Sequence, residues 1–205
     1  MKTPKRLFAL AVLAAGVVLT ACSPLQAGAA AIVGDERITA SQVEADVRET
    51  QAALKRNPDV QQQLQFSLPQ TVLLQRVVTL QYLELGNRNG VSVSDGELDA
   101  FVAQQGGEQQ VELRLLGSGV PPSQARGYIR AYLTEQKLLA KFGGGTDEAA
   151  LQRGQQAMSQ ELDKVKVTYS PRYGAFDPQQ GFVAGDRFGK VPQQAPAADA
   201  GQAGQ

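Results

Sequence analysis

Apolar and polar residues follow one another mostly at helical intervals in this chain, most clearly between Pro69 and Asn87. The apolar residues of this stretch recur every three or four positions, as Val72, Leu73, Val77, Leu80 and Leu83. This spacing places them on one face of a helix, and Asn89-Gly90 is a pair suited to a helix C-terminus. The pattern predicts the central helix of a hydrophobic core.

Further helices are predicted by capping motifs followed by apolar residues at helical intervals. The Ser/Thr-x-x-Glu/Gln capping box occurs as Thr39 with Gln42, Ser41 with Glu44 and Ser94 with Glu97. Thr146-Asp147-Glu148 offers a similar start for a long last helix that reaches Val165. We therefore expect helices over about 40–57, 94–106, 111–116, 123–142 and 147–165.

Short extended segments are predicted towards both ends of the chain. Ala30 to Val33 and Glu36 to Ile38 flank Gly34-Asp35, a pair suited to a tight turn, and indicate a hairpin. Val165, Val167 and Tyr169 alternate with polar residues, which is typical of a half-buried strand. The expected fold is mainly α, with a small β element formed by the N-terminal hairpin and the C-terminal strand.

The first 21 residues have the three parts of a signal peptide. A basic start with Lys2, Lys5 and Arg6 is followed by an apolar run from Leu7 to Leu19 and by the small residues Thr20-Ala21. A transmembrane helix is the alternative, but it needs about 20 apolar residues and this run is shorter. Residues 1–21 are therefore expected to be removed.

The sequence Leu19-Thr20-Ala21-Cys22 resembles the lipobox of bacterial lipoproteins. In that family the peptidase cuts before a cysteine that carries diacylglycerol, which implies cleavage between Ala21 and Cys22 and lipidation of Cys22. A buried structural cysteine is the alternative, although a lone thiol is unusual in an exported protein. We expect a protein anchored by its lipid to the cell membrane on the extracytoplasmic side, with residues 22–30 as a tether.

The charge of the mature chain argues against a nucleic-acid partner. Removal of residues 1–21 takes away three of the 20 basic residues, which leaves 17 against 20 acidic residues and a net charge of about −3. The basic residues form no cluster of the kind that binds phosphates. The remaining length suits one core, which we assign to residues 31–188. Residues 189–205 are rich in Gln, Ala, Pro and Gly and are predicted to be disordered.

The composition also removes several classes of enzyme, because the chain contains no histidine. The Ser-His-Asp and Cys-His systems need an imidazole, and the usual zinc sites combine His with Cys. The chain has neither a phosphate-binding loop nor a nucleophile elbow. We expect no catalytic residue, no metal site and no cofactor.

The order of the predicted elements resembles the N-terminal domain of the SurA and PrsA family of extracytoplasmic chaperones. The resemblance begins with the strand, turn and cap of Ala31 to Thr39 and continues through the helices around 72–83 and 94–102. It then includes Val120-Pro121-Pro122-Ser123, the helix to Phe142 and the last helix and strand, so that it covers residues 30 to about 178. It implies a helical core that holds unfolded polypeptide by apolar contacts.

The chain departs from that family at Gly143-Gly144-Gly145. At this place SurA and PrsA insert parvulin prolyl isomerase domains, whose active sites contain histidine. The chain has no histidine and no room for such a domain. The resemblance therefore implies a binding protein and argues against an enzyme.

Aromatic residues are the candidates for contact with a bound peptide. Tyr173 and Phe176, beside Arg172, either seal the C-terminal segment to the helices, which we favour, or line a groove for peptide. Tyr128 and Tyr132, one helical turn apart, pose the same choice, and core packing is again favoured. Phe101 is expected in the core.

These observations predict a chaperone-like lipoprotein that binds unfolded or newly exported polypeptides. The alternative is a scaffolding lipoprotein that docks one folded partner, and a peptidyl-prolyl isomerase is disfavoured. An apolar groove that stays exposed after the helices assemble would favour the chaperone, whereas a closed, polar surface would favour the scaffold.

Overall fold

The computed structural model describes residues 27–183. The predicted signal peptide, its cleavage site at Ala21 and Cys22, the lipidation site at Cys22 and the tail over residues 189–205 lie outside the described residues. The elements in chain order are β1 (Ala29–Val33), β2 (Glu36–Thr39), α1 (Ala40–Arg56), α2 (Leu68–Arg88), α3 (Asp95–Gln104), α4 (Glu108–Leu116), the 3-10 turn η1 (Pro122–Gln124), α5 (Ala125–Gly143), α6 (Glu148–Leu162), β3 (Val167–Tyr169), the 3-10 turn η2 (Pro171–Tyr173), β4 (Ala175–Asp177) and β5 (Gly181–Val183). The prediction of a mainly α fold is confirmed.

Strands from the N-terminal and C-terminal parts of the described chain form a three-stranded antiparallel sheet of order β2-β1-β3. Val33 pairs with Glu36 across the turn at Gly34-Asp35, as the sequence predicts. On its other edge β1 pairs with β3, with Val33 opposite Val167 and Ala31 opposite Tyr169. The expected pairing of the hairpin with the C-terminal strand is confirmed.

Side-chain caps fix where the helices begin. At α1 the amide of Gln42 donates to Thr39 Oγ1 at 3.1 Å, and the amide of Thr39 donates to Gln42 Oε1 at 2.7 Å. Ser94 and Glu97 form the same reciprocal pair at α3. Asp147 Oδ1 accepts from the amide of Ala150 at α6. Each cap satisfies amide groups that would otherwise lack a partner in the first helical turn.

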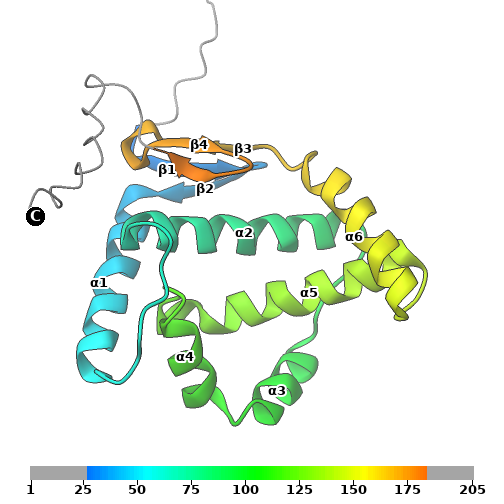
Figure 1. Cartoon of the computed structure of the whole chain (residues 1–205), viewed down its shortest axis with the longest axis horizontal. Coiled ribbons are helices and arrows are strands. Elements are labelled where there is room, and N and C mark those ends of the chain that lie inside the picture. Colours follow the sequence, from blue (N-terminus) through cyan, green and yellow to red (C-terminus); the bar gives the residue numbers. More distant parts are fainter. Residues whose placement is uncertain (1–26, 184–205) are drawn as a thin grey trace, which may run out of the picture.

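The main core lies along α2, which runs between the sheet and α5 (Figure 1). Leu80 and Leu83, both expected on the core face of α2, are only partly buried, and Leu85 joins the buried set instead. The fully buried side chains of this core include Val33, Ile38, Val43, Val72, Leu73, Val77, Leu85 and Leu138. Burial of a side chain of this size contributes about 1.5–3 kcal/mol to the stability of the fold. Because half of these side chains belong to α2, this helix is the main support of the core.

A second, smaller core holds α3 and α4 against α5. Its buried residues are Val93, Leu98, Val102, Val111 and Ile129. Gly106 and Gly107, both at positive φ, form the turn between α3 and α4, a conformation that favours glycine. The two helices consequently meet in a V below α5 in Figure 1.

Several boundaries differ from the prediction, and α4 begins at Glu108 rather than at Val111. The expected tether over residues 22–30 is too long, because Ala29 and Ala30 belong to β1 and are buried. The sequence does not show where the strand begins, because alanine occurs both in strands and in flexible tethers. The last helix ends at Leu162 rather than Val165, because a tight turn, in which the amide of Val165 donates to the Leu162 carbonyl at 2.9 Å, directs Val165 into the core.

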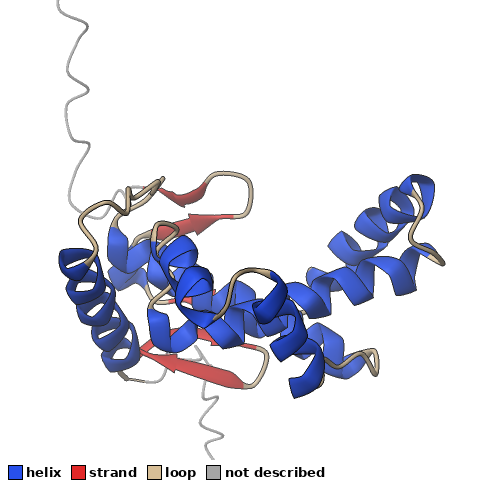
Figure 2. Cartoon of the chain, turned by 90° about the horizontal axis from the view of Figure 1, so that it is seen from below, coloured by secondary structure: helices blue, strands red, loops and turns tan. Residues whose placement is uncertain are grey.

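A second hairpin, formed by β4 and β5, was not predicted. Asp177 Oδ1 accepts from the amides of Gln179 and Gln180 at 2.8 and 2.9 Å and shapes its turn. Figure 2 shows the strands in two groups, one for each sheet. An aromatic cluster joins the hairpin to the rest of the fold and consists of Phe66, Tyr169, Phe176 and Phe182.

The helical pair α5 and α6 approaches closely because glycines occupy its contact points. A Cβ atom at Gly143 would overlap the carbonyl oxygen of Ala150, and one at Gly154 would overlap that of Leu139. No helix within residues 27–183 combines the length and apolar character needed to cross a membrane.

Candidate functional site

An open groove of about 330 Å³ lies between α3, α4 and α5. Its volume is at the lower end of the range of ligand pockets. We call it the tyrosine groove, and the residues that line it are Phe101, Gln105, Val111, Arg114, Leu115, Tyr128, Ile129 and Tyr132.

The helical repeat of α5 places two tyrosines at this groove. Tyr128 and Tyr132 are one turn apart and therefore share a face, while Ile129 turns into the smaller core. Tyr132 is 41 % exposed, and its ring centroid lies 5.8 Å from that of Phe101. Core packing, the interpretation favoured for Tyr132, is therefore wrong, because this residue lies on the open side of the second core.

Tyr128 also borders two small hollows on the side that faces α2, of about 40 and 60 Å³. Tyr82 and Glu135 line the second hollow, where the Tyr82 hydroxyl donates to Glu135 Oε1 at 3.0 Å. Burial, reinforced by Glu135, raises the pKa of both the Tyr82 and the Tyr128 phenol. A phenol is neutral near pH 7 even at its ordinary pKa of about 10, so both rings present an aromatic, uncharged surface.

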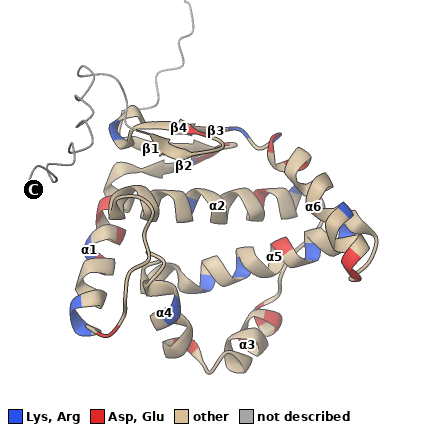
Figure 3. Ribbon diagram, viewed as in Figure 1, with Lys and Arg blue, Asp and Glu red and all other residues tan. Residues whose placement is uncertain are grey.

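Ion pairs hold α3 against α5 and fix the wall of the groove. Figure 3 shows basic residues along α5 and acidic residues on α3. The pairs and their N–O distances are Arg126 with Asp99 at 2.6 Å, Arg130 with Asp95 at 2.7 Å and Lys137 with Glu97 at 2.5 Å. The hydrogen bond from Arg130 lowers the pKa of Asp95, and the bond from Lys137, followed by that from Ser94, lowers the pKa of Glu97 to about 2. These two carboxylates stay ionised well below neutral pH.

The arginine of the groove is itself used as a brace. Arg114 on α4 donates from Nη1 to Gln105 Oε1 at 2.8 Å and from Nη2 to the Gln105 carbonyl at 3.3 Å. Gln105 is the C-cap residue of α3, so this contact ties the two arms of the V together across the rim. The inner wall is left to aromatic and aliphatic side chains.

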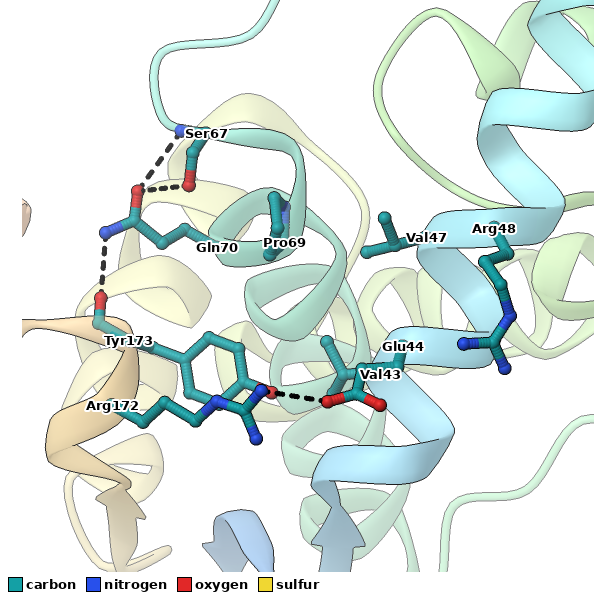
Figure 4. Close-up of a pocket in the computed structure, with 9 residues that line it drawn as sticks. All are labelled: Val43, Glu44, Val47, Arg48, Ser67, Pro69, Gln70, Arg172 and Tyr173. Atoms are coloured by element: carbon teal, nitrogen blue, oxygen red, sulfur yellow. Dashed lines mark hydrogen bonds and ion pairs between the residues drawn. The ribbon is translucent and has the colours of Figure 1, made fainter.

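A larger cavity of about 480 Å³ lies between α1, the start of α2 and η2 (Figure 4). We call it the α1–η2 cavity. Tyr173, only 9 % exposed, contributes its ring to the wall. The other lining residues are Val43, Glu44, Val47, Arg48, Ser67, Pro69, Gln70 and Arg172.

The five candidate peptide contacts thus fall in three places. Tyr128 and Tyr132 line the tyrosine groove, whereas Arg172 and Tyr173 line the α1–η2 cavity. Phe176 lines neither cavity and stacks on Tyr169 with ring centroids 4.3 Å apart. No residue is shared between the linings of the two cavities.

Several lining residues have no strong signal in the sequence. Arg114 and Leu115 belong to a helix that the sequence predicts only as a short segment, and Arg48 reads as one more polar residue on the outer face of α1. The pairs Phe101 with Gln105 and Val111 with Leu115 do have the i, i+4 spacing of a shared helix face. That spacing indicates that the two residues of each pair lie on the same side of a helix, but not which other element packs against that side.

The walls of both cavities present aromatic rings, aliphatic groups, amides and guanidinium groups, and the α1–η2 cavity also presents the Glu44 carboxylate and the Ser67 hydroxyl. Within residues 27–183 no group of three or more His, Cys, Asp or Glu side chains is arranged to hold a metal ion. The chain matches no protein-family model, no curated protein and no solved structure.

Proposed function

We propose that this chain is a lipid-anchored, extracytoplasmic protein that binds unfolded or newly exported polypeptides in the manner of a SurA-type chaperone. The observation that carries the proposal is the exposure of Tyr132 in an open groove beside Phe101 and Tyr128. Aromatic side chains of this kind are the usual anchors of protein interfaces, since they supply a large apolar area at a low entropic cost.

The size of the tyrosine groove supports weak and transient contact. A volume of about 330 Å³ has room for one or two client side chains rather than for a folded surface. Burial of one such apolar side chain contributes about 1.5–3 kcal/mol, which alone gives only weak binding. Release is then rapid, as a holding chaperone without nucleotide requires.

The proposal includes no chemical step. The chain has no histidine, and Tyr82 and Tyr128, whose pKa is raised by burial, are neutral phenols rather than nucleophiles. The braced wall between α3 and α5 presents a preformed surface, so no cofactor is needed to organise it. Prolyl isomerase activity is not part of the proposal.

The position of β1 sets how far the domain reaches from the membrane. The first strand begins at Ala29, seven residues after Cys22. An extended chain spans at most about 3.6 Å per residue, so a lipid on Cys22 would hold the start of β1 within about 25 Å of the bilayer. The domain would therefore stay close to the membrane from which clients emerge.

Suppression of aggregation tests the proposal. The full chain in neutral detergent is mixed with unrelated unfolding proteins, such as citrate synthase, luciferase and rhodanese, and light scattering is followed. We expect suppression by the unchanged chain, a 5- to 30-fold higher concentration requirement for Tyr132→Ala, roughly the effect of losing about 1–2 kcal/mol, and recovery by Tyr132→Phe.

Leu151→Ala is the matched control, because Leu151 is 38 % exposed but lies on α6, away from the groove. It should leave suppression unchanged. Equal effects of Tyr132→Ala and Leu151→Ala, or no suppression at all, would refute the proposal. A single stoichiometric partner in a crosslinked pull-down, without suppression, would support the scaffolding alternative.

A further inference from the structure

One of the arginines that line the α1–η2 cavity, Arg48, makes no side-chain hydrogen bond to another residue within residues 27–183. Gln70 Nε2 donates to the Tyr173 carbonyl at 2.8 Å, and Gln70 Oε1 accepts from the amide and the hydroxyl of Ser67 at 3.1 and 2.7 Å. Glu44 Oε1 accepts from Arg172 Nη2 at 2.9 Å. Arg48 is the remaining charged group, and within residues 27–183 its guanidinium has no hydrogen-bond or ion-pair partner (Figure 4).

The lining therefore carries one uncompensated positive charge. Arg48 and Arg172 contribute two, and Glu44 removes one. The pair between Glu44 and Arg172 is itself exposed, with side chains 48 % and 65 % accessible, so that it is weak and open to exchange.

Apolar groups lie beside these charges. Val43, Val47 and Pro69 form the wall between Arg48 and Tyr173, whose ring closes the opposite side. A ligand that matches this cavity combines one carboxylate with adjacent apolar groups. The volume of about 480 Å³ is within the usual range for a small ligand or a few residues of peptide.

We propose that the α1–η2 cavity binds a carboxylate-bearing segment of extended peptide, with Arg48 as its main anion contact. A planar guanidinium binds a carboxylate through two parallel hydrogen bonds, and a single negative charge balances the net charge of the lining. A phosphate dianion would bring excess charge close to Glu44. The cavity differs from the tyrosine groove in both residues and chemistry, so this inference goes beyond the proposed function and does not depend on it.

Isothermal titration calorimetry with three short peptides tests the proposal. The peptides share the sequence Ala-Ala-Leu-X-Leu-Ala-Ala with an acetylated N-terminus, where X is Asp with an amidated C-terminus, Asn with an amidated C-terminus, or Asn with a free C-terminal carboxylate. The full chain in neutral detergent should bind the first or the third peptide about tenfold more tightly than the second, the factor for about 1.4 kcal/mol. The pair of carboxylate peptides distinguishes a side-chain carboxylate from a chain end.

Substitutions show whether the peptide binds in the α1–η2 cavity. Arg48→Ala should weaken the preferred carboxylate peptide about tenfold, and Arg48→Lys should recover part of the loss. Arg56→Ala is the matched control, because Arg56 is an exposed arginine on the same helix and does not line the cavity. Tyr132→Ala should leave this affinity unchanged, which separates the inference from the proposed function.

Three results would overturn the inference. The first is equal affinity for the three peptides, or binding of none of them. The second is an equal loss in Arg48→Ala and Arg56→Ala, which would indicate a general charge effect. The third is binding to vesicles of anionic phospholipid that Arg48→Ala abolishes, without any preference among the peptides, since that would assign the cavity to a lipid headgroup.

Discussion

The carboxylate of Asp46 on α1 accepts hydrogen bonds from both Nε and Nη2 of Arg76 on α2, the second at 3.1 Å. Asp46 is only 4 % exposed, and the side chain of Arg76 is 20 % exposed. The other ion pairs within residues 27–183 lie at more accessible positions. This pair fixes α1, one wall of the α1–η2 cavity, to the central helix.

Removal of Arg76 should therefore destabilise the protein strongly. We expect Arg76→Met to lower the free energy of unfolding by about 3–5 kcal/mol, because the Asp46 charge is left buried without a partner. Urea denaturation followed by circular dichroism measures the change. Addition of Asp46→Leu should recover part of it, since the unpaired charge is then gone. Arg88→Met, at the exposed pair with Glu84, should cost about 1 kcal/mol or less, and equal losses at the two arginines would contradict the account.

The glycine contacts between α5 and α6 lead to a second stability prediction. Gly154→Ala should lower the free energy of unfolding by about 1–3 kcal/mol, because its Cβ would overlap the backbone of Leu139, which cannot move aside as a side chain can. Gly127→Ala is the control on α5, where a Cβ would meet no atom within 4 Å. That change should raise the stability by about 0.5–1 kcal/mol. A destabilising Gly127→Ala together with a neutral Gly154→Ala would show that the helices do not meet in this way.

Glu97 should titrate at an unusually low pH. The hydrogen bonds from Lys137 and Ser94 lower its pKa from 4.5 to about 2, so its contacts favour the folded state above pH 4.5 and are lost as the pH falls towards 2. Carboxyl carbon NMR shifts report this titration directly. Lys137→Ala should move the pKa back towards 4.5, because the largest contribution is removed. Lys141→Ala, which removes a lysine that bonds to the Asn89 carbonyl, should leave the pKa in place.

The proposed lipid anchor is tested at Cys22. Cys22→Ala should release the protein from membranes into the soluble fraction, because no diacylglycerol can then be attached. Cell fractionation measures this, and metabolic labelling with a fatty acid should be lost in parallel. A variant that stays bound to membranes would show that another part of the chain holds it there.

The helices were the most predictable part of the fold. Capping pairs such as Thr39 with Gln42 and Ser94 with Glu97 act over three residues, so the sequence displays both partners together. The pairing of β1 with β3 was also predicted, because the alternation of Val167 and Tyr169 with polar residues indicates a half-buried strand that can pair with the N-terminal hairpin. The second hairpin was not predicted, because each of its strands has only three residues, too few to show an alternation of apolar and polar positions.

The candidate site was less predictable, because it depends on contacts between distant elements. Tyr128 and Tyr132 were identified as a pair by spacing, but the exposure of Tyr132 follows from how α3 and α4 pack against α5. The role of Arg114 in the groove depends on its contact with Gln105, and Arg48 stands out because its guanidinium has no such contact within residues 27–183. Local spacing indicates which residues share a face, whereas long-range packing decides whether that face is covered.

The central claim is that the tyrosine groove contacts unfolded polypeptide. Photocrosslinking from the groove tests this claim most directly. Benzoylphenylalanine is introduced in place of Gln105, a lining residue, or in place of Gln152, an exposed residue on α6. Each protein is irradiated with reduced, carboxymethylated α-lactalbumin, which stays unfolded. We expect strong crosslinks from position 105, weak ones from position 152, and a loss at position 105 when Tyr132→Ala is added. Equal crosslinking from both positions, or none from position 105, would contradict the account.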